Sequence, residues 1–221
     1  DARRQGFAEP DATEDIDGHD AAAKLAILAS LAFGSRVTAS QVYREGISAI
    51  TPRDIAYAKE LGYAVKLLAI AQDRDGAIDA RVHPALLPLA HPLASVSDER
   101  NAVLVRGKAA GSVVFSGSGA GGPPTAVAVV SDIIDLARNR RRGGSGRLAH
   151  TAFDDRPIYP IGDLVIPYYF SMQVIDRPGV FAKVATVFGE EAVSIAAIVQ
   201  KSRGEVADVV LLTHEARESA V

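Results

Sequence analysis

Two pairs of strands around short polar turns constrain the fold of this chain more than any other feature. Residues 63–72 and 77–88 are apolar segments on either side of DRDG, in which Gly76 can adopt a positive φ. Residues 101–117 repeat the pattern around the turn RGKAAG. These turns predict two hairpins. With the helices beside them, they indicate an α+β fold in which helices cover one face of an antiparallel or mixed sheet.

Three helices are predicted in the same part of the chain. The first spans residues 19–34 and ends on a glycine, a common C-terminal cap. The second has Thr51 as its N-cap, followed by a proline, and runs over 52–61. The third covers 126–137 and leads into the basic, glycine-rich run 138–147, which is typical of a solvated linker.

From residue 168 the pattern starts again, which predicts a second domain. Residues 168–176 are a predicted strand, 177–191 a turn and an amphipathic helix, and 192–202 and 205–215 two further strands. This order is the beginning of a βαββαβ unit, whose last helix and strand we expect to lie outside this chain. The chain does not start with Met, which also predicts a piece of a longer protein.

The first predicted helix carries an acid and a lysine on one face. Asp20 and Lys24 are four residues apart, so their side chains lie one helical turn apart. One interpretation is a surface ion pair that stabilises the helix by about 0.2–0.5 kcal/mol. The other is a proton donor or a partner for a substrate carboxylate, with Glu9 and Asp15 nearby. The run after Lys24 is apolar nearly all round, which predicts a buried helix and favours the second interpretation.

Two glycine-containing turns are candidate ligand loops. GSGAGG, residues 117–122, matches G-x-G-x-x-G, but two prolines follow it and no strand with a ribose-binding acid comes next. It therefore predicts a loop that approaches a ligand rather than a dinucleotide fingerprint. Asp176 and Gly179 lie at a predicted strand-to-helix turn, which is either a tight turn alone or a site where helix amides hold a carboxylate.

Composition narrows the classes of partner. The net charge of −3 shows no basic footprint, so we expect no nucleic-acid partner. The apolar runs are too short or too broken to cross a bilayer, and we expect a cytoplasmic protein with no membrane contact. There are no cysteines, and the histidines show no metal-ligand spacing, so no metal site is expected. His83 and His91, each before a proline, are expected to pack in loops.

Several segments resemble a known enzyme family. EPDATEDIDGHDAAAKLAILASLAFG, RVHPALLP and GSGAGGPPTAVAVVSDIIDLAR are similar to the substrate-binding half of homoserine dehydrogenases. VIDRPGVFAKVATVFGEEAVSIAAIVQK resembles the ACT domain that many bacterial members append. The resemblance implies a homoserine dehydrogenase domain over 1–138, a linker over 139–166 and a partial ferredoxin-like ACT domain over 167–221. The family's nucleotide-binding domain would precede residue 1.

The resemblance also implies an activity and a site. The family interconverts L-aspartate 4-semialdehyde and L-homoserine with NAD(P), on the way to threonine and methionine. Lys24 matches its catalytic lysine, Glu9 and Asp20 match residues that bind homoserine, and Asp15 matches an acid that flanks them. The loop that closes over the cofactor corresponds to Gly119, Gly121 and Thr125.

The same resemblance implies regulation and assembly. Threonine is the expected effector at the ACT turn of Asp176 and Gly179, and a homo-oligomer is the expected assembly. We expect the chain alone to be inactive without the nucleotide-binding domain. The alternative from another functional class is a threonine-sensing and oligomerisation module that has no activity of its own.

Overall fold

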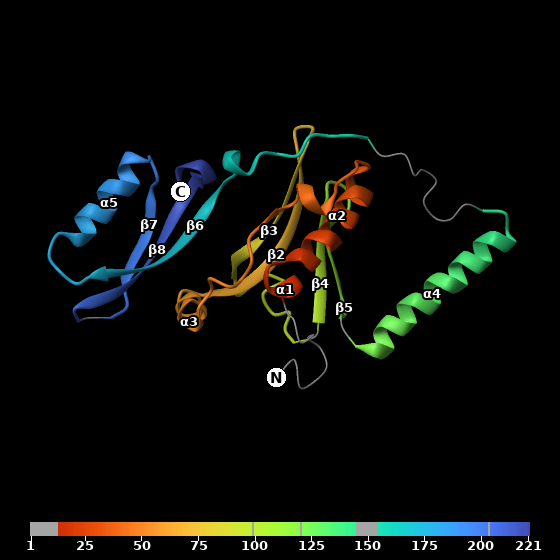
Figure 1. The fold of residues 1–221 in the computed structure, drawn as a ribbon, viewed down its shortest axis with the longest axis horizontal. Coiled ribbons are helices and arrows are strands. Elements are labelled where there is room, and N and C mark those ends of the chain that lie inside the picture. The colour runs from red at the N-terminus through yellow and green to blue at the C-terminus, as the bar shows by residue number, and fades with distance from the viewer. Residues whose placement is uncertain (1–12, 99, 120, 145–153, 203) are drawn as a thin grey trace.

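The structure is a computed structural model that describes residues 13–98, 100–119, 121–144, 154–202 and 204–221. Figure 1 shows two units joined by a long connection, the first with two sheets and the second with one. The elements of the first unit are α1 (Thr13–Ile16), α2 (His19–Phe33), η1 (Ala39–Gln41), β1 (Tyr43–Arg44), α3 (Pro52–Glu60), β2 (Tyr63–Arg74), β3 (Ala77–Pro88), β4 (Arg100–Gly107), β5 (Gly111–Ser118) and α4 (Gly122–Arg141). Those of the second unit are η2 (Ile161–Asp163), β6 (Val165–Ile175), α5 (Val180–Glu190), β7 (Ile195–Gln200), β8 (Val206–Arg217) and η3 (Glu218–Ala220).

A long hairpin forms the centre of the first unit. β2 and β3 pair antiparallel from Tyr63 opposite Pro88 to Arg74 opposite Ala77, which confirms the predicted strand pair. The turn is shorter than predicted, because Asp75 and Gly76 alone connect the strands, with φ of 48° and 92°. Two positive φ values are those of a type I′ turn, whose twist matches that of the strands. β1 adds to β3 in parallel and gives the order β1-β3-β2.

Helix α2 packs on this hairpin with one face only. Its buried residues are spaced as one helical stripe and contact apolar side chains of β2 and β3: Ala22, Leu25, Ala26 and Ala29. The prediction of the helix and of its left-handed glycine cap, Gly34 at φ 61°, is confirmed. The prediction that the helix is buried nearly all round is wrong. Ile27, Leu28 and Leu31 are 64%, 45% and 46% exposed, because no described element covers the face away from the hairpin.

Helix α3 follows its predicted capping signals. The Thr51 hydroxyl accepts from the backbone N–H of Asp54, and the Asp54 carboxylate accepts from the backbone N–H of Thr51. This reciprocal capping box satisfies two backbone donors at the start of the helix. The helix ends at Glu60, and Gly62 at φ 85° turns the chain directly into β2.

The second predicted hairpin does not join the first sheet. β4 and β5 form a separate two-stranded sheet, since turns from Pro88 to His91 and from His91 to Ala94 lead the chain away from β3. α4 is longer than predicted and includes the start of the basic run expected in the linker. Its last turn carries Arg138, Arg140 and Arg141, and cations there are favoured by the helix dipole.

The second unit confirms the predicted order of strand, helix, strand and strand. Its sheet has the order β6-β8-β7, and all pairs are antiparallel. α5 covers one face, where Phe170 of β6 meets Phe188 edge to face at 5.1 Å between ring centroids. A single 3₁₀ turn, η3, follows β8.

Part of the segment predicted as a linker is attached to the first unit. Asp154 exchanges backbone hydrogen bonds with Gly34 and Arg36, and the Arg156 guanidinium lies 2.6 Å from the Asp73 carboxylate. The backbone of Ile78 also bonds to Pro157 and Tyr159 on either side of Ile158. The chain thus enters the second unit from a fixed position.

Candidate active site

The predicted acid and lysine form an ion pair on the open face of α2. Lys24 Nζ lies 2.6 Å from Asp20 Oδ2, and the two side chains are 61% and 45% exposed. A pair this exposed contributes little to stability. What it does provide is a lysine amine that is directed by one carboxylate and remains accessible to a ligand.

The approach to α2 is shaped by two glycines. Gly18 has a φ of 76°, and a Cβ there would meet Val82 Cγ1 at 3.0 Å. A Cβ on Gly46 would lie 2.6 Å from the backbone oxygen of Ile16, so only glycine allows this close contact with α1. This contact fixes the short helix that carries Asp15 immediately before α2. Neither glycine was predicted, because nothing in the sequence around Gly18 or Gly46 indicates which backbone lies against it.

Of the two other residues predicted to bind the substrate, the structure describes one. Asp15 lies in the short helix α1, which directly precedes α2 in the chain. Glu9 lies outside the described residues. The structure therefore brings Asp20 and Lys24 together and places Asp15 on the neighbouring helix.

The predicted cofactor loop leads into the start of α4. Gly121 is the residue before α4, with φ 113° and ψ 146°, and its carbonyl accepts from the Thr125 hydroxyl at 2.9 Å. A Cβ on Gly119 would lie 1.7 Å from Nδ2 of Asn101, which leaves no room for a side chain in the present arrangement. Among the described residues, no hydrogen bond or ion pair joins this loop to Lys24.

The predicted effector turn connects β6 to α5. Gly179 precedes α5 with a φ of 89°, and its carbonyl accepts from the backbone N–H of Lys183. The backbone N–H of Asp176 donates to Glu205. The turn therefore has the strand-to-helix geometry that the sequence predicted, with a left-handed position that favours glycine.

A buried charge cluster in β3 includes one histidine that was expected in a loop. The Asp79 carboxylate pairs with Arg81 and, at 2.9 Å, with Arg74. The Arg81 Nε donates to His83 Nε2 at 3.1 Å. His83 thus lies in a strand, because its neighbour Pro84 fits β3 without interrupting the pairing with β2. Each buried charge has a partner, as burial requires.

Membrane-spanning helices and metal sites were also considered for the described residues. No helix among them is long and apolar enough to cross a membrane. Nor do three or more His, Asp or Glu side chains of the described segments come together as a metal ion would need.

Comparison with known proteins decides the family. The family model described as homoserine dehydrogenase matches residues 1–134, and the one described as ACT domain matches residues 168–221. This chain belongs to the homoserine dehydrogenase family. The second unit of the structure is its ACT domain.

Relatives cover the whole chain. The homoserine dehydrogenase of Corynebacterium glutamicum is 47% identical over 99% of this chain and 50% of its own length. That of Mycobacterium leprae is 48% identical over 100% of this chain and 52% of its own length. The crystal structure of a homoserine dehydrogenase from Thiobacillus denitrificans, 42% identical, matches with a TM-score of 0.90 over 99% of this chain and 51% of that one. The chain spans about half the length of the relatives it matches.

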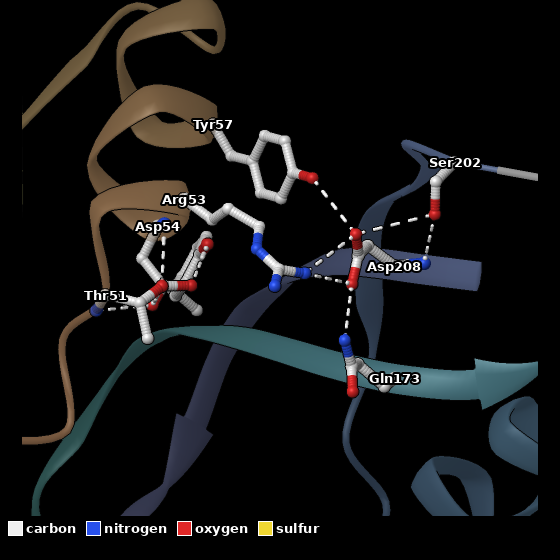
Figure 2. A network of polar contacts seen from close by, with 8 residues as sticks. Thr51, Arg53, Asp54, Tyr57, Gln173, Ser202 and Asp208 are labelled. Atoms are coloured by element: carbon white, nitrogen blue, oxygen red, sulfur yellow. Dashed lines mark hydrogen bonds and ion pairs between the residues drawn. The ribbon is translucent and has the colours of Figure 1, made fainter. Parts of the chain in front are cut away.

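A polar contact between α3 and the ACT domain was not predicted. Figure 2 shows the Asp208 carboxylate between Arg53 and Tyr57 of α3 and Gln173 of β6. The only signal in the sequence is a single acid within the apolar strand VADVVLL. The hydrogen bond from the Gln173 amide and the charge of Arg53 outweigh partial burial and lower the pKa of Asp208.

The second acid of this contact is Asp54. Burial opposes its ionisation, but hydrogen bonds from Thr51, Ser171 and Tyr169 together hold the pKa of Asp54 below its usual value. Burial and the hydrogen bond to Asp54 raise the pKa of Tyr169 to about 12.

Proposed function

We propose that this chain carries the substrate-binding half of a homoserine dehydrogenase, an NAD(P)-dependent oxidoreductase that interconverts L-aspartate 4-semialdehyde and L-homoserine. The observation that carries the proposal is the exposed Lys24 amine held 2.6 Å from Asp20 on the α2 face that no described element covers. This pair lies within the segment that matches the homoserine dehydrogenase family model.

Lys24 is proposed to move the proton of the reaction. Reduction of the aldehyde develops negative charge on the carbonyl oxygen, and an ammonium group within reach can donate a proton to it. In the reverse direction the same amine accepts the proton of the homoserine hydroxyl. Asp20 orients the amine, and Glu9, Asp15 and Asp20 supply negative charge for the ammonium group of the amino-acid substrate.

The loop before α4 fits a cofactor that approaches closely. Bound NAD(P) supplies or accepts the hydride at the substrate carbon. The Asn101 side chain fills the space beside Gly119, Gly121 adopts a backbone conformation that favours glycine, and the Thr125 hydroxyl closes the loop by donating to the Gly121 carbonyl. Gly119, Gly121 and Thr125 are therefore the residues of this chain proposed to contact the cofactor.

The decisive test is Lys24→Ala in the full-length enzyme. We expect the turnover of homoserine to fall by about 10²–10⁴-fold, the usual contribution of a positioned acid–base group, with the Kd for NADPH unchanged. Lys108→Ala is the matched control, because Lys108 is an exposed lysine in the turn between β4 and β5. Equal turnover in the two variants would remove Lys24 from the mechanism.

The ACT domain is proposed to sense threonine at the turn of Asp176 and Gly179, in a cytoplasmic homo-oligomer. The support is the left-handed Gly179 immediately before α5, because the start of a helix is a favourable place for a carboxylate. Calorimetric titration with threonine and, separately, with homoserine tests this assignment. The division into 1–138, 139–166 and 167–221 remains part of the same proposal.

A further inference from the structure

Helix α3 forms hydrogen bonds and ion pairs with the ACT domain from its first turn to its last residue. Near its start, the Tyr169 hydroxyl donates to Asp54 Oδ1 at 3.0 Å. In the same first turn, Arg53 Nη1 lies 3.0 Å from Asp208 Oδ1, and one turn further on the Tyr57 hydroxyl donates to Asp208 Oδ2 at 3.4 Å. At its end, Glu60 pairs with Lys201.

Three of the four residues of α3 that make these contacts share one face, and the fourth, Asp54, lies at its edge, four residues before the buried Ala58. Positions 53, 57 and 60 are separated by four and three residues, the spacing of neighbours on a helix surface. Ala58 is turned away from them and is fully buried. The helix therefore presents a polar face to the ACT domain and an apolar one to the first unit.

The ACT sheet presents a matching polar face. Along β6, Phe170 faces α5, so alternation places Tyr169 and Gln173 on the opposite side. Gln173 lies directly opposite Asp208 in the register of β6 and β8 and donates to it at 3.0 Å. Figure 2 shows Asp208 between Gln173 and the α3 residues Arg53 and Tyr57.

Asp208 is the centre of this contact. Its side chain is 18% exposed and receives hydrogen bonds from both sides, from Arg53 and Tyr57 on α3 and from Gln173 on the sheet. Charge-assisted hydrogen bonds are stronger and more directional than neutral ones. A shift of β8 relative to α3 therefore breaks several bonds of one carboxylate at once.

α3 is linked in turn to the helix of Lys24. A two-residue turn, Leu61 and Gly62, joins α3 to β2, and α3 also packs against that strand. Leu67 and Ala71 of β2 contact the core that holds the buried face of α2. Packed elements of this kind pass on displacements, because a dense interior resists compression.

We propose that α3 couples the ACT domain to the Lys24 helix, with Asp208 as the residue that fastens α3 to the ACT sheet. A rearrangement of the sheet then reaches α2 through α3 and β2. This inference rests on the proposed function, since it assigns the regulation of the same site.

The test compares full-length wild-type protein with Asp208→Asn by amide hydrogen exchange. The control is Glu215→Gln, because Glu215 is an exposed acid on the same strand that makes no contact with α3 among the described interactions. Without any ligand, we expect Asp208→Asn to speed exchange in α3 and α2, with β8 still protected. Tyr57→Phe removes one hydrogen bond only and should have a smaller effect on the same segments.

A second arm uses L-threonine as the probe. In wild type and Glu215→Gln, threonine should change exchange in α5, α3 and α2. In Asp208→Asn the response of α5 should persist, and the factor by which threonine and homoserine alter each other's Kd should fall at least about fivefold. Unchanged exchange of α2 in ligand-free Asp208→Asn would overturn the coupling. Absence of homoserine oxidation in wild type would instead refute the proposed function. The exchange measured without ligand would still show whether α3 couples the ACT domain to α2.

Discussion

At the scale of single residues, backbone conformation constrains the candidate site as much as the charged groups do. Gly121 adopts φ 113° and ψ 146°, close to a region that is essentially restricted to glycine. Its neighbour Gly122 has ordinary backbone geometry, and a Cβ there would meet nothing within 4 Å. A side chain is therefore strained at Gly121, whereas the neighbouring Gly122 has room for one.

This difference gives a prediction for the proposed cofactor loop. Gly121→Ala should strain the loop by about 1–3 kcal/mol. In the full-length enzyme the KM for NADPH should therefore rise about tenfold or more, the equivalent of 1.4 kcal/mol. Gly122→Ala is the matched control and should bind NADPH like wild type. Equal KM values for the two variants would show that the loop conformation does not matter for cofactor binding.

At the scale of elements, α3 depends on its first turn. Thr51 and Asp54 satisfy each other's backbone donors, and Asp54 also accepts from Tyr169 of the ACT domain. One residue, Asp54, therefore serves both the helix and the contact between the two units.

Removing the cap should destabilise the protein measurably. Thr51→Ala should lower the free energy of unfolding by about 1 kcal/mol, the usual cost of losing an N-cap. Denaturant titration of the full-length protein measures this change. Thr186→Ala is the control, because Thr186 lies inside α5 and its hydroxyl donates to the carbonyl of Ala182 in the same helix. A loss as large in the control would argue against a capping role.

Local signals explain why most elements could be predicted from the sequence. The Asp-Gly turn defined the long hairpin, and the Thr-Pro-x-Asp start defined α3. The open face of α2 was not predictable, because apolar residues such as Ile27 do not show which element covers them. The contact around Asp208 was missed for a related reason, since its partners come from positions up to 155 residues away.

At the scale of the whole molecule, two carboxylates stabilise the arrangement of the units. Asp54 and Asp208 both have pKa values below normal in the folded state. Their contribution is therefore complete above the unfolded value of about 3.9 and is lost as the pH falls through the folded pKa values.

The lowered pKa values predict how stability responds to acid. The free energy of unfolding should change little through these groups between pH 8 and pH 5 and should decrease below about pH 4. Asp54→Asn should reduce this acid-dependent loss, whereas Asp132→Asn, at an exposed position on α4, should retain it. Chemical denaturation at a series of pH values provides the measurement. An identical acid profile for Asp54→Asn would assign the pH dependence to other groups.

The order β6-β8-β7 has a consequence for how the ACT domain is made. β8 is central in the sheet but is synthesised after both of its neighbours. During translation, β6 and β7 consequently have no partner strand until β8 leaves the ribosome, whereas the β2–β3 hairpin is already complete. The second unit can form its sheet only in one late step, beside a first unit whose helix α3 is already in place.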